Sequence, residues 1–412
     1  MLTIEPALAR RGSRQRAGAG RLAIALAGGG PLGAFYEIGV LHALGEAIVG
    51  RALTEFDVYV GVSSGALVAA GLANGFDTTA LGATFVHDES TAIPFAPATL
   101  MRPALAEYTL RLRLIPQVLG NIIRQYSREP LRGGWPGPAD AFGRLIPAAL
   151  FDNGRLERYL HAAFSAAGHT DDFRELARRL YVVATNLNTA QSVAFGTPRH
   201  AHVPISRAVV ASAALPGLYP AVNIEGEEYV DGALLHTMHA LLALEAGCRL
   251  VICINPLVPF NAARPGRQRI NLASRGLPDI LGQTFRALIH SRMQVGMASY
   301  RARFPQADTL LVEPDRHDET LFFTNVFGYA GRRQLTDHAY QCARRDLLAQ
   351  ADRLVPILRR HGLDLDTQRL RDRRRRFSTA LRQRSLDARR AAGRLGCALD
   401  RLETLLAGSA DG

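Results

Sequence analysis

Two strand–turn–helix units follow each other near the start of the chain, and this order constrains the fold more than any other sequence feature. Residues 22–26 form an unbroken apolar run, and residues 34–48, after a run of glycines, carry apolar side chains at helical spacing. Residues 56–75 repeat the order, with the strand "DVYV", the turn "GVSSG" and a helix that ends at Gly75. Apolar strands that alternate with helices predict an α/β fold with a mostly parallel sheet.

The rest of the chain adds strands to this sheet and suggests where its domains end. Further strand signals lie at residues 179–187, in a hairpin-like segment at 221–234, and at 248–257. Between about 84 and 150 the pattern is broken by prolines, which indicates a helical insertion. We therefore expect a disordered basic tail over 1–20, one α/β domain over 21–360 with that insertion, and an arginine-rich helical extension over 361–412.

The charge balance is strongly basic. Among 412 residues, 49 basic side chains, all of them arginine, stand against 37 acidic ones and give a net charge of +12. Such a chain is attracted to anionic surfaces, either nucleic acid or a phospholipid leaflet. Aromatic residues are nearly absent around the arginine run 373–376, which argues against binding of single-stranded nucleic acid. A solvated helix face is the simpler interpretation of that run.

The sequence suggests a cytoplasmic location. The basic first twenty residues are not followed by a signal-type cleavage pattern, and no uncharged stretch reaches the ~18 residues that span a bilayer. The four cysteines form no C-x-x-C pair, which argues against a disulfide framework or a zinc site: Cys248, Cys253, Cys342 and Cys397. Contact with a membrane or a lipid granule would then be peripheral.

The pentapeptide at 61–65 fits G-x-S-x-G in the setting that this motif needs. A strand ends at Gly61 and a helix begins just after Ser63, so a tight turn with small residues on both sides would lift the serine hydroxyl above the sheet. Gly65 completes the motif, whereas Ser64 lies on the helix side. A simple small-residue turn is the alternative interpretation of these five residues. In this setting, we favour Ser63 as a nucleophile.

A serine nucleophile needs a base and a place for the oxyanion. The candidate base is Asp231, which ends a strand where Gly232 permits an exposed turn, although Asp-Gly is also the commonest hairpin dipeptide. Partial burial would raise the pKa of this carboxyl and make it a better proton acceptor. Backbone amides for the oxyanion are expected from the first glycine loop and from the turn at 61–65, called the elbow below: Gly28, Gly29, Gly30, Gly33 and Ser64.

Two other assignments compete for these residues. The glycines also fit a dinucleotide-binding loop, but that fold needs an acidic residue at the end of its second strand, and Glu55 and Asp57 lie at its beginning. A Ser–Asp–His triad would need a histidine, for which His290 and His338 are candidates. The pairs His200/His202 and His236/His239 lack a Glu or Cys at ligand spacing, so we expect no metal site there. No cofactor is expected.

Taken together, these motifs resemble the patatin-like phospholipases. The glycine loop "AGGGPLG", the elbow "GVSSGA", the segment "ASAALPGLYPAV" at 211–222 and "VDGA" follow in the order of that family, over roughly residues 21–255. The resemblance implies a three-layer α/β/α sandwich and a Ser–Asp dyad, carried here by Ser63 and Asp231. It departs at Leu32, where the family usually has Arg or Lys.

The expected function is therefore a serine acyl hydrolase that cleaves fatty acyl esters of lipids through an acyl-enzyme. Three alternatives stay open: a catalytically silent patatin-like protein for lipid binding or regulation, a hydrolase of storage-polyester granules, and a dinucleotide-binding protein. Within the insertion, residues 110–124 mix leucines and isoleucines with Arg111, Arg113 and Arg124. This composition predicts either a helix that docks on lipid or a buried core helix.

Overall fold

A mostly parallel sheet forms the centre of the molecule. The computed structural model describes residues 1–7, 20–87, 102–128, 145–235, 238–263, 271–324 and 329–379. Strands β10, β9, β2, β4 and β5 run parallel in this order, and β1, β6, β7 and β8 join antiparallel. The strands of this sheet are β1 Leu2–Glu5, β2 Arg21–Leu26, β4 Val58–Val62, β5 Arg179–Asn186, β6 Gln191–Phe195, β7 Val222–Ile224, β8 Glu227–Asp231, β9 Cys248–Ile254 and β10 Asp308–Val312.

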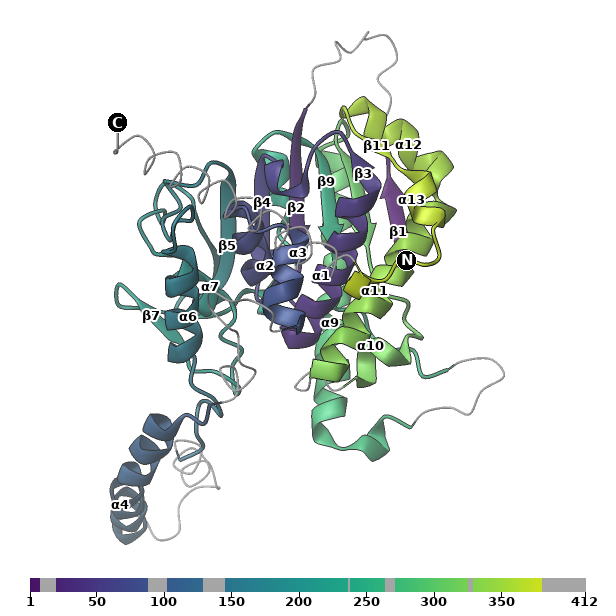
Figure 1. Cartoon of the computed structure of the whole chain (residues 1–412). Helices are drawn as coiled ribbons and strands as arrows, with labels where there is room; N and C mark the ends of the chain where they lie inside the picture. Colours follow the sequence, from purple (N-terminus) through teal and green to yellow (C-terminus); the bar gives the residue numbers. More distant parts are fainter. Residues whose placement is uncertain are drawn as a thin grey trace, which may run out of the picture.

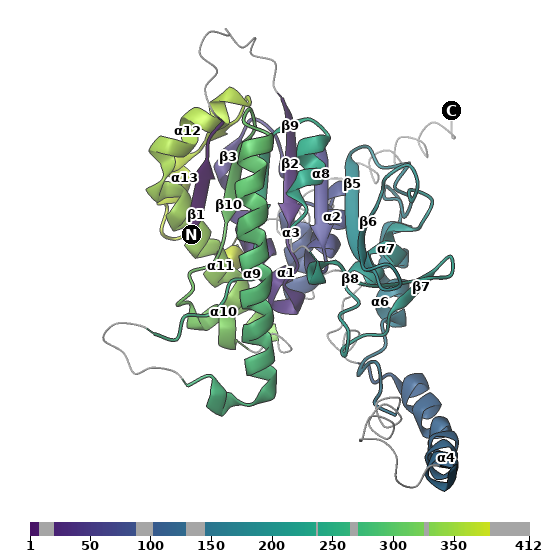
Figure 2. The same cartoon turned by 180° about the vertical axis from the view of Figure 1, so that it is seen from behind.

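Helices cover both faces of this sheet (Figures 1 and 2). One face carries α1, α2 and α11, and the opposite face carries α8 and α9. The longer helices are α1 Gly30–Ala47, α2 Ser64–Ala73, α4 Leu105–Arg128, α6 Gly154–Phe164, α7 Ile205–Ser212, α9 Leu277–Arg303, α11 Tyr329–Ala349 and α12 Ala351–Arg360. The short helices are α3 Thr78–Gly82, α8 Ala240–Glu245, α10 Glu319–Phe323 and α13 Thr367–Arg371.

The side chains of β2 explain the three layers. Leu22, Ile24 and Leu26 belong to the core that packs against α1 and α2, whereas the alternating alanines at 23, 25 and 27 belong to the core beneath α8 and α9. Successive side chains of a strand point to opposite faces, so this strand is buried on both sides. The predicted three-layer α/β/α sandwich with a mostly parallel sheet is confirmed.

The start of the chain differs from the expected disordered tail over 1–20. Leu2–Glu5 form β1, which pairs antiparallel with β10 at the edge of the sheet. Leu2 and Ile4 are buried, because their side chains reach the main core while Thr3 stays exposed. Four residues with two apolar side chains are too short a signal to stand out from a basic segment. Residues 8–19 lie outside the described part of the chain.

The insertion projects from the body as helix α4 (Figures 1 and 2). Leu110 and Leu112 are exposed by 50% and 63%, so α4 is not the buried core helix that was one of the two expectations. Just before the helix, the Ala104 amide donates to the Leu150 carbonyl, and the Leu150 and Phe151 amides donate in turn to carbonyls of the 217–218 loop. No helix within the described residues is both long and apolar enough to cross a membrane.

The expected extension over 361–412 is not separate at its start. Asp364–Leu365 form β11, which pairs with β3 (Ile48–Val49) behind α1, and Phe377 is fully buried. The helix expected from 366 onward is interrupted after α13, because the Asp372 side chain accepts a hydrogen bond from the Arg374 amide and closes a turn. Residues 380–412 lie outside the described part.

Candidate active site

The turn between β4 and α2 holds Ser63 in a strained backbone conformation. Its φ is 52° and its ψ is −123°, a region that non-glycine residues rarely adopt. Gly61 and Gly65 have no positive φ, and they are needed instead for space. A Cβ at Gly61 would lie 2.5 Å from the Ala66 Cα, and one at Gly65 would lie 2.7 Å from the Leu26 carbonyl oxygen. The sequence therefore folds here into the sharp turn that G-x-S-x-G predicts.

Ser212 at the end of α7 supports this turn from below. Its hydroxyl accepts a hydrogen bond of 2.8 Å from the Ser63 amide and donates one of 2.5 Å to the Val183 carbonyl. Ser212 is fully buried, and its hydroxyl therefore satisfies two backbone groups that water does not reach. This residue ties the elbow to strand β5.

Strand register explains why Asp231 meets Ser63. Val62, the last residue of β4, lies opposite Val183 on β5, and Asp231, the last residue of β8, lies opposite the next residue, Ala184. β6 pairs with β5 over residues 182–186, so β4 and β8 must share the other edge of β5. The two strands therefore end head to head, which brings the residues at their ends together.

The two side chains are joined by one hydrogen bond. The Ser63 hydroxyl donates to Asp231 Oδ2 at 2.6 Å, while Asp231 Oδ1 accepts from the Ala233 amide at 2.8 Å. Gly232 is buried rather than exposed, and a Cβ there would collide with the Val183 carbonyl. The hairpin turn lies at Glu225 and Gly226, which both have positive φ, so Asp-Gly does not form it.

The environment of Asp231 suits a proton acceptor. Its side chain is 3% exposed, and burial raises the pKa of this carboxyl to about 6, against the opposing effect of the hydrogen bonds from Ser63 and Ala233. A carboxylate with a raised pKa is still ionised near neutral pH and takes a proton more readily than an exposed one. The pair thus has the geometry and the basicity of a nucleophile and its base.

The glycine loop lies directly beside the elbow. A Cβ at Gly28 would lie 3.1 Å from the Ser63 Cβ, and Gly30, with φ of 60°, lines the same cavity as Ser63. Within the described residues, the backbone amides of residues 28–30 donate no hydrogen bond. The Gly33 amide, in contrast, donates to the Gly29 carbonyl at 3.0 Å and is not available to an oxyanion. Ser64 begins α2, where a first-turn amide has no partner within its own helix.

A cavity of about 140 Å³ opens at this pair. Its lining is almost entirely apolar, and the few polar groups on it include Ser63 and Asp231 themselves. Apolar side chains come from α1, α2, α6, α7 and the 213–219 loop, and among them are Phe35, Ile38, Leu67, Leu156, Val209 and Leu218. An apolar chamber with one reactive hydroxyl fits an acyl chain bound next to its carbonyl carbon.

The histidines considered from the sequence lie elsewhere. His290 contacts Arg316 and Glu313, and His338 contacts Asp318 and Cys342. No described histidine hydrogen-bonds to Ser63 or Asp231, and His236 lies outside the described residues. His202 pairs with Glu225 at 2.7 Å. Among the described residues, the one cluster with donor atoms close enough for a metal ion is Asp318, His338 and Cys342, which the sequence analysis did not identify.

Comparison with known proteins shows the family of this chain. The model of the patatin-like phospholipase family matches residues 24–244, more than half of the sequence, and the chain belongs to that family. No curated protein matches it.

The chain is also similar to solved structures, at low identity. VipD from Legionella pneumophila is 17% identical, with 78% of this chain and 67% of VipD covered, at a TM-score of 0.34. The type III effector ExoU is 17% identical, with 91% of this chain and 63% of ExoU covered, at a TM-score of 0.29. In the ExoU–SpcU complex of Pseudomonas aeruginosa, the identity is 18%, the covered shares are 82% and 61%, and the TM-score is 0.22.

Proposed function

We propose that this protein is a serine acyl hydrolase that cleaves fatty acyl esters of lipids, with Ser63 as nucleophile and Asp231 as base. The observation that carries the proposal is the 2.6 Å hydrogen bond between a strained serine hydroxyl and a buried carboxylate of raised pKa. Membership of the patatin-like phospholipase family supports a lipid substrate.

The reaction follows from what each group can donate or accept. Ser63 Oγ forms a bond to the ester carbonyl carbon while its proton passes to Asp231, and the carbonyl oxygen takes the electron pair. The amides of Gly28, Gly29, Gly30 and Ser64 are the candidates to stabilise this oxyanion. Collapse expels the alcohol, which takes the proton from Asp231. Water then attacks the acyl-enzyme, gives a proton to Asp231 and releases the fatty acid, and Ser63 regains its proton.

The shape of the site supports an acyl ester over the other candidates. A dinucleotide would bring its phosphates into a small apolar cavity, where no described arginine lies. A silent scaffold has no need for a positive φ at Ser63, since such strain costs roughly 1–3 kcal/mol and persists at functional sites. A storage polyester offers the same ester chemistry and is separated from phospholipid by assay of both substrates.

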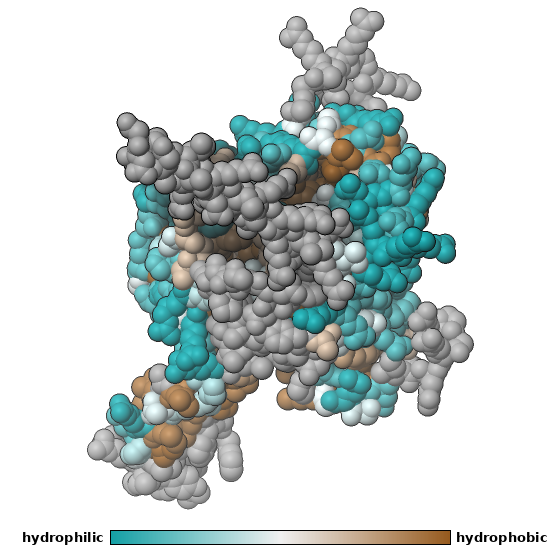
Figure 3. All heavy atoms as spheres, viewed as in Figure 1, coloured by the Kyte–Doolittle hydropathy of each residue, from teal (hydrophilic) through white to brown (hydrophobic). Residues whose placement is uncertain are grey.

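We also propose that α4 brings the enzyme to an anionic lipid surface. Leu110, Leu112 and Ile115 are exposed by 50%, 63% and 36%, with Arg111 and Arg113 between them. Figure 3 shows apolar residues gathered on this projecting helix. The residues just before α4 bond to the segment 150–152, this segment bonds to the 217–218 loop, and Leu218 lines the cavity, so the helix is connected to the wall of the site. The side chains of Leu119, Ile122, Ile123 and Arg124 lie outside the described residues.

Two neighbouring serines allow a matched test of the nucleophile. Ser63→Ala should reduce hydrolysis of a p-nitrophenyl acyl ester by at least about 10⁴-fold, because the acyl-enzyme cannot form. Ser64→Ala should retain measurable activity, since its hydroxyl has no hydrogen-bond partner within the described residues and only its amide is used. Equal loss in both folded variants would refute the assignment.

Binding of vesicles that carry anionic lipid tests the proposed role of α4. Arg111→Gln with Arg113→Gln should weaken binding to vesicles containing phosphatidylserine and lower activity on them, while turnover of a soluble short-chain ester is unchanged. Binding should also weaken as salt rises. Arg353→Gln with Arg359→Gln, on α12 away from α4, removes the same charge and serves as the control (Figure 1). Binding that ignores both salt and the α4 substitutions would contradict the proposal.

A further inference from the structure

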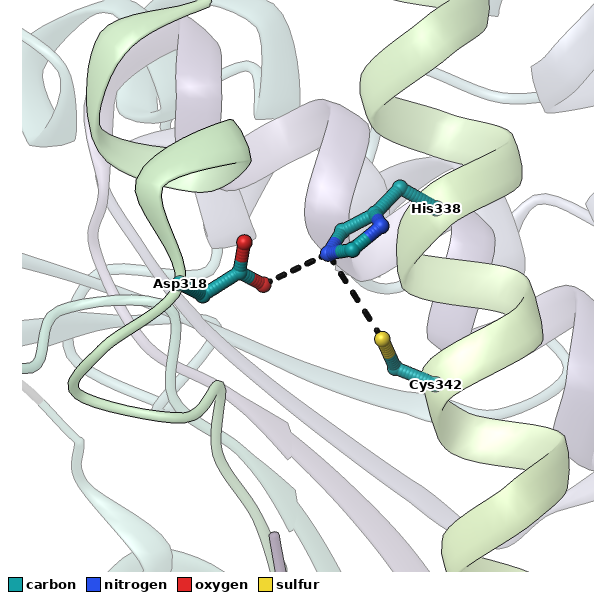
Figure 4. Close-up of side chains that lie close together, drawn as sticks. All are labelled: Asp318, His338 and Cys342. Atoms are coloured by element: carbon teal, nitrogen blue, oxygen red, sulfur yellow. Dashed lines mark hydrogen bonds and ion pairs between the residues drawn. The ribbon is translucent and has the colours of Figure 1, made fainter. Parts of the chain in front are cut away.

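Three donor side chains of different chemistry meet between α10 and α11 (Figure 4). His338 and Cys342 lie one turn apart on α11, so both point from the same helix face. Asp318 precedes α10, and its Oδ1 accepts a hydrogen bond from the Leu321 amide at 3.3 Å. Its Oδ2 points to the helix α11. All three side chains are partly exposed, so an ion can reach them from solvent.

Both neighbours of the imidazole approach the same nitrogen. His338 Nε2 lies 2.7 Å from Asp318 Oδ2 and 3.6 Å from Cys342 Sγ. In a proton relay to a thiol, the carboxylate would hold one ring nitrogen and the thiol would face the other. Here the two groups converge on one point instead. This arrangement excludes a Cys–His–Asp relay and gathers nitrogen, oxygen and sulfur donors within 4.8 Å of one another.

The spacing of these atoms is close to that around a zinc ion. Tetrahedral zinc with a Zn–S bond of ~2.3 Å and a Zn–N bond of ~2.0–2.1 Å places sulfur and nitrogen about 3.5 Å apart. Cys342 Sγ and His338 Nε2 are already 3.6 Å apart. The carboxylate is too close to the nitrogen, at 2.7 Å, because the hydrogen bond draws it in. Zinc would replace that proton and move the oxygen outward by roughly 0.7 Å.

We propose that Asp318, His338 and Cys342 bind a zinc ion, which holds the turn before α10 to helix α11. Thiolate, imidazole and carboxylate are the three ligand types that zinc takes in proteins, whereas calcium and magnesium take oxygen ligands. Three protein ligands leave the fourth position to water at this partly exposed site. Binding displaces the protons of the imidazolium and of the thiol to solvent.

The local charges are compatible with a cation. The carboxylate of Asp318 lies 2.7 Å from His338 Nε2, and its negative charge attracts a cation to this point. Arg345 opposes this effect, because its guanidinium lies 3.0 Å from Cys342 Sγ. That side chain is exposed and lies at the surface of α11, so it can turn into solvent without breaking the core.

The site would stabilise the helix pair beneath the glycine loop. A Cβ at Gly39 of α1 would collide with the Thr336 carbonyl of α11, so the two helices are in close contact. A zinc ion bound on α11 would therefore also stabilise α1, the helix that begins in the glycine loop, at some distance from Ser63.

The experiment uses the full chain, freed of metal with a chelator and titrated with Zn²⁺ alone. We expect one zinc ion per chain at micromolar concentrations or below, a thermal midpoint that rises with zinc, and a thiolate-to-metal charge-transfer band when Co²⁺ replaces it. Cys342→Ser and His338→Ala should each weaken zinc binding by at least about 100-fold, a larger effect than the loss of groups around the ligands. Both variants should keep their ester hydrolysis within about twofold.

His161→Ala is the matched control, because His161 pairs with Asp171 at 2.8 Å and lies in no metal-binding cluster formed by the described residues. It should bind zinc as the unaltered chain does. If Cys342→Ser fails to fold, Asp318→Asn and the cobalt band of the unaltered chain decide the matter. The absence of the band, no binding at micromolar zinc, or full binding by the folded variants would each overturn the proposal. None of these outcomes bears on the role of Ser63.

Discussion

Two carboxylates of this molecule make hydrogen bonds of nearly equal length and acquire opposite properties. Asp231 meets a neutral hydroxyl at 2.6 Å, and burial raises the pKa of its carboxyl to about 6. Asp318 meets an imidazole at 2.7 Å, and although burial tends to raise its pKa, the hydrogen bond and the charge of His338 lower it. Burial raises the pKa of both carboxyls and both hydrogen bonds lower it, so the balance between burial and the charge of the partner, and not the distance, decides whether a carboxylate accepts a proton or stays an anion.

The largest expected effect separates the two carboxylates directly. Asp231→Asn removes the base and should lower kcat for a soluble acyl ester by about 10⁴-fold, as much as Ser63→Ala, because members of a catalytic pair act as a unit. Asp318→Asn is the matched substitution and should leave that rate within about twofold. A near-normal rate in folded Asp231→Asn would move the base to another residue, and His236 would be examined first.

The raised pKa of Asp231 predicts the acid limb of the pH profile. The base must be ionised to accept the serine proton, so kcat/KM should fall about tenfold per pH unit below a midpoint near 6. A carboxyl of ordinary pKa, near ~3.9, would keep nearly full activity to about pH 5. The profile is measured with a short-chain ester, in the range where circular dichroism shows the chain folded. A flat profile down to pH 4.5 would contradict the assigned environment of Asp231.

A smaller effect on kcat is expected when the hydroxyl of Ser212, which supports the turn at Ser63, is removed. Ser212→Ala leaves the Ser63 amide and the Val183 carbonyl without their partner, at a cost of roughly 1–3 kcal/mol. We expect kcat to fall about tenfold and KM to change little, because Ser212 positions Ser63 without touching substrate. Ser206→Ala, on the same helix but bonded to Asp171, serves as the control. An unchanged kcat in Ser212→Ala would show that the turn at Ser63 keeps its conformation without the hydrogen bonds of Ser212.

A third carboxyl sharpens the comparison, since Glu37 has neither a serine nor a cation as partner. It is fully buried in α1, its two oxygens have no hydrogen-bond partner within the described residues, and burial raises its pKa well above the usual value. The folded chain keeps it protonated while the unfolded chain ionises it above about pH 4.3, so stability falls as pH rises. Glu37→Gln should remove this dependence of stability on pH. The thermal midpoint of the variant, relative to that of the unaltered chain, should therefore rise by a few degrees between pH 5 and pH 8. Parallel curves would contradict it.

Much of the fold and the main pair could be predicted from the sequence, because each leaves a local pattern. Apolar strands alternate with helices, and the turn at Ser63 needs small residues on both sides. Two features left no such pattern. Ser212 acts through one hydroxyl that binds the Ser63 amide. The proposed zinc site joins a helical His–Cys pair to an aspartate twenty residues before the histidine, a contact that only the packing of α10 on α11 creates.

The Gly33 amide was predicted as an oxyanion donor, but α1 begins early enough to use it within the helix. Sequence patterns place a helix start only to within a few residues, and here those few residues decide which amides stay available. The amides of residues 28–30 keep the predicted role, which is tested only by the reaction itself.

The most direct test of the central claim is to label the intact protein with a fluorophosphonate and to locate the adduct by peptide mass spectrometry. Such a reagent reacts with an activated serine and leaves unactivated hydroxyls unchanged. We predict one adduct, on Ser63, with no adduct in Ser63→Ala and a strongly reduced one in Asp231→Asn. An adduct on Ser64 or elsewhere, or no adduct in a folded chain that hydrolyses acyl esters, would contradict the account.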